Sequence, residues 1–360
     1  MTTISEATER YEAWLGQRIT LIPEDLARKH EAMKSGIFPF LRATYYRWAQ
    51  TWPEVCPKEY QAPFVLGIGD LHVENFGTWR DVEGRLAWGV NDFDEACRVP
   101  YTCDLVRLAT SAQMAIATDK LKFSGERSCD SLLKGYQDAL EAGGGAYVLS
   151  EKHQNLRQMA VERLKDPNKF WDKMKAWKDL PEPMPAGVED ALRRVLPDPQ
   201  MTCAFAHRLA GLGSLGRRRY IAVGEWHGGL VAREAKELAS SAWAFAHPDQ
   251  NDYAIHYQEM INRSIRCPDP FVQLKGKWIV RRLAPDCSRI ELSSLPKEHD
   301  GYSLLHAMGW ETANVHLGSV TAEVLAADLK QRKDGWLHRA GEAMVDSTQR
   351  DWDAWKSAGR

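Results

Sequence analysis

"FVLGIGDLHVENFGTWRDVEGRLAWGVNDFD", residues 64–94, is the stretch that decides the expected fold. It begins within the apolar run APFVLGI, which predicts a short buried strand. The segment GTWRDVEGRLAWGV predicts two strands joined by a turn at DVEG, because apolar residues alternate along its second half. A hairpin brings its two ends together, so the side chains of Asp70, Asn75 and Asp92 are expected to converge at one edge of a small sheet.

The ordered triple of Asp70, Asn75 and Asp92 fits what phosphoryl transfer requires. In this chemistry one carboxylate takes a proton from an attacking hydroxyl, while an amide and a second carboxylate hold Mg²⁺. The alternative is that Asp70 and Asn75 only satisfy backbone groups of a turn, as these residue types often do. That alternative is the better one for either residue alone, whereas the ordered triple favours a catalytic loop.

Three neighbours of this triple have more than one interpretation. His72 is either a metal ligand or a residue that orients the loop, although a single loop histidine is more often structural. Asp94 is expected to join Asp92 on the metal ion. The segment YTCDLVRLATSAQMAIA predicts a helix, at whose start Asp104 either braces the loop backbone or, like Thr102, caps the helix.

A glycine-rich segment, GLGSLG, lies much later in the chain and contains Gly211, Gly213, Ser214 and Gly216. A dinucleotide-binding fingerprint would need a helix directly after it, but the β-prone RRRYIAV follows. The glycines are therefore expected to form a hairpin turn that lies over phosphates. Lys236 is then in a position to reach nucleotide phosphates, and Glu259, on a helix predicted over 250–265, is a candidate to hold it.

Each of these residues also has a plainer interpretation. The glycines can make a tight turn, and Lys236 and Glu259 can lie on solvated faces. The arginine run 217–219 could touch phosphate, but its default place is the exposed side of a strand.

The remaining pattern predicts an α+β chain in two lobes. Helices are expected over 5–55 and for most of 125–180, and the proline-rich DLPEPMPAG predicts a linker. The hairpin FVQLKGKWIVRRL and amphipathic helices from 301 onward follow. We expect three regions: 1–197, the first part of a helical lobe with a catalytic and metal loop at about 62–95; 198–295, a β-rich nucleotide-binding lobe; and 296–360, helices that return to the helical lobe.

Composition limits the possible partners. The chain has 360 residues, 44% of them hydrophobic, which is enough to bury a large core. A formal net charge of -2 gives no overall attraction to nucleic acid or to anionic membranes. The sequence has no signal pattern and no apolar run of about 20 residues. Its seven cysteines include no CxxC pair, so a reducing cytoplasm is the expected location.

The catalytic segment also carries a resemblance. GDLHVENFGTWRDVEGRLAWGVNDFDEA, with CDLVRLA after it, resembles aminoglycoside and choline phosphotransferases of the protein-kinase-like superfamily. More closely, the chain from about 25 to 355 resembles the bacterial family called domain of unknown function 2252, through KSGIFPFLRATYYRWA, GLGSLGRRRYIAV, AKELASSA, FVQLKGKWIVRRL and GWETANVHLG. The resemblance implies that Asp70 is the base, that Asn75 and Asp92 bind Mg²⁺, that the glycine loop covers ATP and that Lys236 pairs with its phosphates. Arg42 and Arg281 lie in family segments and are candidates for the rim of the site.

The sequence departs from the kinase pattern in three ways. Ile68 stands where these enzymes usually have histidine, and Arg218 stands where valine usually follows the glycine loop. The acidic loop also precedes the glycine loop, which is the reverse of the kinase order and implies a circular permutation.

The leading hypothesis is a Mg²⁺-ATP-dependent phosphotransferase that acts on a hydroxyl of a small molecule or a protein. The acceptor itself cannot be named, although residues 120–200 are expected to line its pocket. A nucleotide-binding pseudokinase without turnover and transfer of a nucleotidyl group are alternatives. A metal-dependent phosphoesterase is a weaker one: GDLH suits such a metal loop, but the further D-x-H string upstream of it and the later G-N-H string that this class needs are both missing.

Overall fold

The computed structural model describes residues 2–119, 121, 123–149, 153–162, 164, 166–177, 180, 183–290 and 298–358. It has an α+β architecture in which antiparallel sheets and helices alternate along the chain. The expected linker, residues 179–187, lies partly outside the described residues. Each helix among the described residues is too short or too polar to cross a lipid bilayer.

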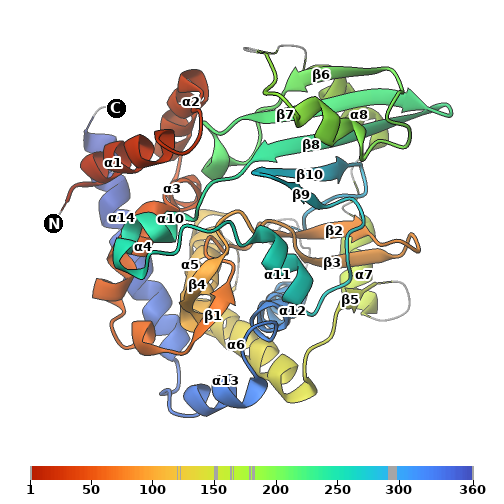
Figure 1. Ribbon diagram of the computed structural model, residues 1–360. Coiled ribbons are helices and arrows are strands. Elements are labelled where there is room, and N and C mark those ends of the chain that lie inside the picture. The colour runs from red at the N-terminus through yellow and green to blue at the C-terminus, as the bar shows by residue number, and fades with distance from the viewer. Residues whose placement is uncertain are drawn as a thin grey trace.

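A five-stranded antiparallel sheet forms from the later part of the chain (Figure 1). Its strands run in the order β6-β7-β8-β10-β9: β6 Cys203–His207, β7 Arg219–Trp226, β8 Gly229–Glu237, β10 Trp278–Leu283 and β9 Gln273–Lys275. Side chains alternate between the two faces of a strand. Tyr220 and Ala235 therefore pack in an apolar cluster with helix α9 (Val188–Arg193), while Glu234 and Lys236 point to the opposite face.

Two smaller sheets contain the acidic stretch. Strand β1 (Phe64–Gly67) pairs with β4 (Cys97–Pro100), and β2 (Phe76–Arg80) pairs with β3 (Leu86–Val90), beside the short β5 (Tyr147–Val148). The predicted hairpin with its turn at DVEG is confirmed. Within the turn the Asp81 carboxylate accepts hydrogen bonds from the N–H groups of Glu83 and Arg85, which fixes the turn geometry.

Helices surround these small sheets. The predicted helices of 5–55 are confirmed as α1 Ile4–Gly16, α2 Pro23–Lys34, α3 Ile37–Ala43 and α4 Tyr45–Val55. The others are α5 Tyr101–Thr118, α6 Gly125–Ala142, α7 Gln154–Glu162, α8 Pro167–Lys175, α10 Ala242–Ala246, α11 Tyr257–Arg263, α12 Glu298–His316, α13 Ala322–Leu329 and α14 Trp336–Ser357. Helix α6 lies against α12, where Gly135 and Gly309 face backbone of the partner helix that leaves no room for a Cβ atom.

Two local predictions are wrong. The helix expected over 250–265 is shorter, Tyr257–Arg263: Pro248–Gln250 forms a separate 3-10 turn, which ends at Asn251 with a left-handed backbone of φ 52°. Helix α5 begins after Pro100 without a side-chain cap. Thr102 instead donates a hydrogen bond to the carbonyl of Glu59, and Asp104 serves the acidic loop as described below.

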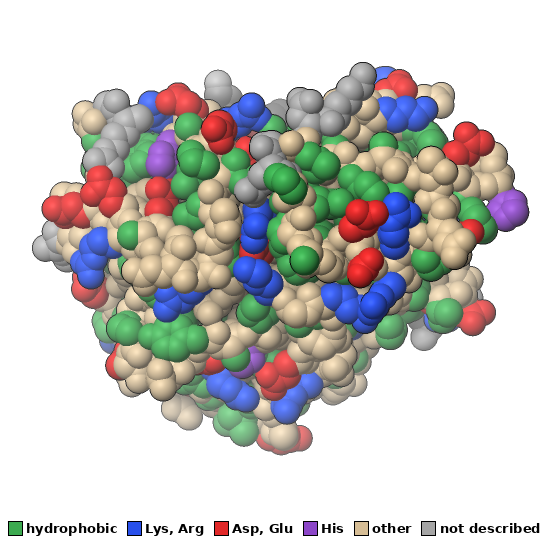
Figure 2. Space-filling model, turned by 45° about the horizontal axis from the view of Figure 1, so that its top comes forward, with side chains coloured by type: hydrophobic (Ala, Val, Ile, Leu, Met, Phe, Trp, Pro, Cys, Tyr) green, Lys and Arg blue, Asp and Glu red, His purple; other side chains and the backbone are tan. Residues whose placement is uncertain are grey.

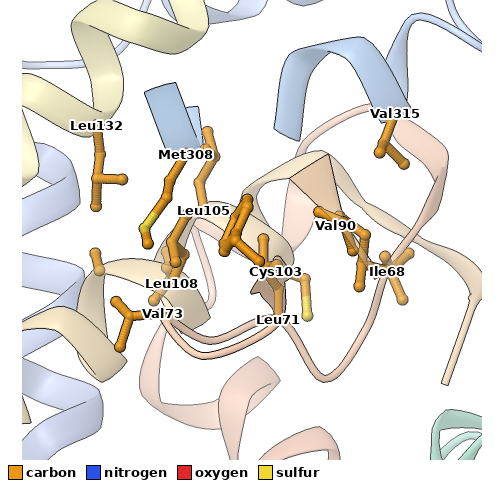
Figure 3. Packing of buried hydrophobic residues seen from close by; sticks show 14 of the residues in the cluster. Ile68, Leu71, Val73, Val90, Cys103, Leu105, Leu108, Leu132, Met308 and Val315 are labelled. Carbon is orange, nitrogen blue, oxygen red and sulfur yellow. The ribbon is translucent and has the colours of Figure 1, made fainter. Parts of the chain in front are cut away.

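The surface carries charged and apolar side chains together, whereas the core is built from apolar side chains. On the face shown in Figure 2, basic and acidic side chains lie interspersed, with apolar ones between them. In the core, Ile68, Leu71 and Val73 of the acidic stretch pack with apolar side chains of α5 and α12 (Figure 3). Because these loop residues are almost fully buried, their polar neighbours are held at fixed positions on the core surface.

Candidate active site

One cavity lies between the acidic loop and the glycine loop. Most predicted site residues line it: Arg42, Asp70, His72, Asn75, Asp92, Asp94, Gly211, Gly213, Ser214 and Lys236. The described part of the chain thus brings together segments far apart in the sequence. Gly216, Glu259 and Arg281 are placed elsewhere, as described below.

The acidic loop is locked by its backbone as well as by its apolar side chains. Gly69 has a left-handed backbone with φ 81°, and its Cα faces the carbonyl of Glu95 too closely to carry a side chain. The Asp104 carboxylate, fully buried on α5, accepts hydrogen bonds from the N–H groups of Ile68 at 2.7 Å and Gly69 at 2.8 Å. His316 of α12 lies 2.9 Å from the same carboxylate. Asp104 therefore braces the loop directly before Asp70.

Asp70 is held by an arginine on α5. The Nε of Arg107 donates to Oδ1 of Asp70 at 2.9 Å, and its Nη2 also donates to Asp70 and to the carbonyl of Leu41. Burial raises the pKa of Asp70 to about 6, although Arg107 opposes the rise. A carboxylate with this pKa can accept a proton near neutral pH, which is the property a general base needs.

His72 and Asn75 shape the loop around Asp70. The Nδ1 of His72 accepts a hydrogen bond from the N–H of Glu74 at 3.2 Å, and burial together with the Arg42 charge holds the pKa of His72 well below its usual range. His72 is thus a neutral residue whose ring helps to orient the loop. The Asn75 Oδ1 accepts from the N–H of His72 at 3.0 Å and keeps one lone pair for another partner.

Asp92 and Asp94 face Lys236 of β8 across the cavity. The Lys236 Nζ lies 3.4 Å from Oδ2 of Asp92 and forms an ion pair with Asp94 as well. Burial would raise the pKa of Asp92, but the positive charges of Lys236 and Arg281 hold it at about 2. Burial lowers the pKa of Lys236 to about 8. At neutral pH Asp92 is therefore ionised, and Lys236 carries its positive charge.

The expected role of Glu259 is corrected by the structure. Its carboxylate lies 3.0 Å from Nδ1 of His256, which directly precedes helix α11, and 3.2 Å from Nε of Arg263 at the end of that helix. Glu259 also forms an ion pair with Arg98 at 4.0 Å, while Lys236 is held by the two aspartates of the acidic stretch.

The glycine loop joins β6 to β7, and its middle approaches the acidic loop. Gly211 has φ 76°, and the Ser214 hydroxyl donates to the Gly211 carbonyl at 3.1 Å while it accepts from Arg219 at 2.8 Å. Gly216 does not line the cavity. It packs against Leu26 of α2, and its carbonyl accepts from the N–H of Ile22, so it anchors the end of the loop.

Gly213 of the glycine loop lies close to Arg42 and Asp70. A Cβ atom at this position would lie 2.7 Å from the carbonyl oxygen of Arg42 and 3.5 Å from Oδ2 of Asp70. We expect Gly213→Ala to lower the free energy of unfolding by about 1–3 kcal/mol through this overpacking. Urea denaturation measures the effect. Gly229→Ala is the matched control, because its added Cβ meets nothing nearer than 3.8 Å, and equal losses in both variants would contradict the prediction.

The two candidate rim arginines lie in different places. Arg42 forms an ion pair with Glu74 at 2.7 Å and lines the cavity beside the acidic loop. Arg281 of β10 does not line it. Its Nε donates to the buried Glu234 at 2.9 Å, beneath the five-stranded sheet.

Several site residues were missed by the sequence analysis. Lys29 is buried beside the glycine loop, 3.4 Å from the Gly213 carbonyl, and burial lowers its pKa to about 8. The arginine run was expected on an exposed strand face, but Arg217 is buried and donates to Glu95 at 2.7 Å. Arg107 was also missed. Its place in the apolar helix segment DLVRLA could have indicated a buried ion pair, because a charged residue in an apolar helix needs a buried partner.

The cavity offers oxygen ligands that suit a Mg²⁺ ion. Among the described residues, no group of three or more His, Cys, Asp and Glu side chains is arranged to hold a metal ion. Mg²⁺ in nucleotide enzymes is usually held by one or two carboxylates together with waters and substrate phosphates. The carboxylates of Asp92 and Asp94, with the Asn75 amide in the same cavity lining, are oxygen ligands of this kind.

Comparison with known proteins identifies one related family. Residues 19–178 match the model of a family described as an uncharacterized protein conserved in bacteria (DUF2252). The match supports the resemblance to that bacterial family over the part of the chain that includes the acidic loop, and the glycine loop lies beyond it. No curated protein and no solved structure matches the chain.

Proposed function

We propose that this protein is a Mg²⁺-ATP-dependent phosphotransferase with a circularly permuted, two-lobed kinase-like fold. The observation that carries the proposal is the single cavity in which Asp70, Asn75 and Asp92 face the glycine loop and Lys236. In protein kinases a glycine-rich loop covers the phosphates, and the lysine that pairs with them lies on the third strand. Here the loop joins the first two strands of the five-stranded sheet, and Lys236 lies on the third.

The order of the parts along the chain is the reverse of that in kinases, which the proposed permutation explains. Helices α1 and α14, from the two ends of the described chain, lie side by side (Figure 1). Arg47 of α4 and Asp351 of α14 also form an ion pair at 2.8 Å, so helices from the two end regions of the chain contact each other. Permutation is tolerated where chain ends lie close together.

The proposed reaction uses Asp70 as the proton acceptor. An acceptor hydroxyl oxygen forms a bond to the γ-phosphorus of ATP, the bond from that phosphorus to the β-phosphate oxygen breaks, and ADP leaves. The hydroxyl proton passes to Asp70, which Arg107 holds in orientation. Lys236 would bind phosphate oxygens, and Asn75, Asp92 and Asp94 would hold Mg²⁺, whose charge neutralises those oxygens.

Nucleotide binding is the first experimental test. ATP at a hundred times its dissociation constant should stabilise the protein by about 2.7 kcal/mol, which a thermal-shift assay with ATP, ADP and GTP detects. Asp92→Ala should abolish the Mg²⁺-dependent part of the shift, and Lys236→Ala should weaken binding of each nucleotide. Lys275→Ala, on the exposed edge strand β9, is the charge-matched control. A wild-type protein that no nucleotide stabilises would overturn the proposal.

The pH dependence of turnover follows from the two shifted groups. Asp70 must be ionised to accept a proton, so kcat/KM should fall about tenfold per pH unit below about 6. Lys236 must be charged to bind phosphate, so kcat/KM should fall again above about 8. ATP consumption measured from pH 4.5 to 9.5 gives the profile. A flat profile across pH 6 would exclude Asp70 as the base.

A second candidate function is a nucleotide-binding module without turnover. The observation that favours it is the partner of Lys236, which is the aspartate pair of the acidic stretch instead of Glu259. Mass spectrometry of a metabolite mixture incubated with the protein and Mg²⁺-ATP separates the two functions. A phosphorylated product supports the transferase, an adenylylated product indicates nucleotidyl transfer, and binding without any product supports the module.

A further inference from the structure

A second cavity adjoins the first beneath the five-stranded sheet. Asn91, Asp92 and Arg289 line both cavities, so a ligand in the second one would reach the acidic stretch. Among the described residues, its lining holds two carboxylates, Asp92 and Asp269, and six basic side chains: Lys173, Arg208, Arg266, Arg281, Arg282 and Arg289. The surface in Figure 2 mixes both charges, whereas this lining is mainly basic.

Buried Glu234 positions part of this basic lining. Its carboxylate is fully buried and forms ion pairs with Arg208, Arg219 and Arg281, the last two at 2.9 Å. Three guanidinium groups share this carboxylate, and the nearby Asp92, which also acts on Arg281, pairs with Lys236 as well. Elsewhere in the lining, Arg282 pairs with Asp286 and Arg289 with Glu74. The cluster around Glu234 therefore keeps a net positive charge. Arginine side chains held in this way lose little freedom when they bind an anion.

Arg266 adds a donor that has no partner among the described residues. Its guanidinium lies 4.6 Å from the ring centre of Trp79 and 5.0 Å from that of Phe93, so two aromatic rings hold it in place. Its buried Nη1 has no hydrogen-bond partner among the described residues, and the same is true of the buried Nε of Arg208. A buried donor without a partner is costly unless a ligand or water supplies an acceptor.

We propose that the second cavity binds the phosphate groups of a ligand. Planar guanidinium groups match phosphate oxygens in pairs, and the net positive charge and the two buried donors of Arg208 and Arg266 both call for an oxyanion. Two sources share this chemistry, the phosphates of the nucleotide itself and a phosphate on the acceptor. The assignment to one of these sources rests on the proposed function, whereas the anion site does not.

Tripolyphosphate, used without Mg²⁺ or nucleotide, is the probe for the anion site. Isothermal titration of the full chain should show binding, and Arg208→Gln should weaken it about tenfold or more because a charge-assisted contact is lost. Glu234 keeps Arg219 and Arg281 in this variant, so the fold is expected to persist. Arg218→Gln is the matched control: Arg218 also pairs with a buried glutamate, Glu237, which Lys277 still neutralises.

The outcomes distinguish the two sources of phosphate and also test whether the anion site exists. If tripolyphosphate still binds to protein saturated with ATP, and Arg208→Gln leaves ATP affinity unchanged, the site serves a phosphorylated acceptor. If ATP displaces the probe and Arg208→Gln weakens ATP binding, the site serves the nucleotide. No binding to wild type, or equal binding to wild type, Arg208→Gln and Arg218→Gln, overturns the anion site. Failure of the phosphotransferase would appear instead as unaltered ATP binding in Asp92→Ala and Lys236→Ala.

Discussion

Asp70→Asn is expected to lower turnover by about 10²–10⁴-fold while it leaves Mg²⁺-ATP binding nearly intact. Asparagine keeps the shape of the side chain and an oxygen that can accept the Arg107 hydrogen bond, but it cannot take up a proton. ATP consumption with an identified acceptor, or slow ATP hydrolysis without one, measures the loss. Titration of ATP into the same preparation shows whether binding is retained.

The control for this prediction must separate chemistry from folding. Arg107 is fully buried, so the loss of its charged partner also weakens the fold to some degree. The thermal shift caused by ATP therefore has to be compared between wild type and Asp70→Asn. A variant that binds ATP and turns over at the wild-type rate would show that Asp70 is not the base.

Glu234→Gln should lower the free energy of unfolding by about 3–5 kcal/mol, more than is expected for Gly213→Ala. The change keeps the size of the side chain but leaves Arg208, Arg219 and Arg281 close together without their shared carboxylate. Urea denaturation at pH 7 measures the loss. The double variant Glu234→Gln with Arg208→Gln should recover part of it, because one of the repelling charges is removed. A loss below about 1 kcal/mol would contradict the expected role of Glu234.

The effect of Glu234 should also depend on pH. Burial would raise its pKa, but the three arginine charges hold the pKa of Glu234 well below its usual range. A carboxylate with a lowered folded-state pKa stabilises the fold above the pKa of the unfolded chain, about 4.3, and this stability is lost as pH falls toward the folded-state pKa. The difference between wild type and Glu234→Gln should therefore shrink below about pH 4.

The local pattern of the sequence was enough to predict much of the fold. Period-two alternation and turn residues predicted the hairpin over 76–90, and β-prone residues after Gly216 predicted a strand where a dinucleotide-binding protein has a helix. These predictions hold because turn chemistry and strand propensity act over a few residues. The same short-range signals also predicted that Asp70, Asn75 and Asp92 would converge, and all three line one cavity.

What the sequence could not predict depends on contacts between distant segments. Nothing near Lys236 indicates that two aspartates more than a hundred positions earlier are its partners. Likewise, Arg217 is in a strand-like run that suggests exposure, and only the tertiary structure shows that Glu95 neutralises it in the interior. Pairing of buried charges is decided by packing and not by spacing along the chain.

The bond between Asp104 and His316 has a consequence for how the molecule is made. The two residues are 212 positions apart, and the His316 ring also lies 2.9 Å from the hydroxyl of Tyr136 on α6. Such distant pairings form late, because the loop between them must close first. During synthesis the acidic loop leaves the ribosome long before α12 is made. Until then Asp104 has no interaction with His316. The geometry of the candidate site is therefore expected to be completed only after α12 has been made.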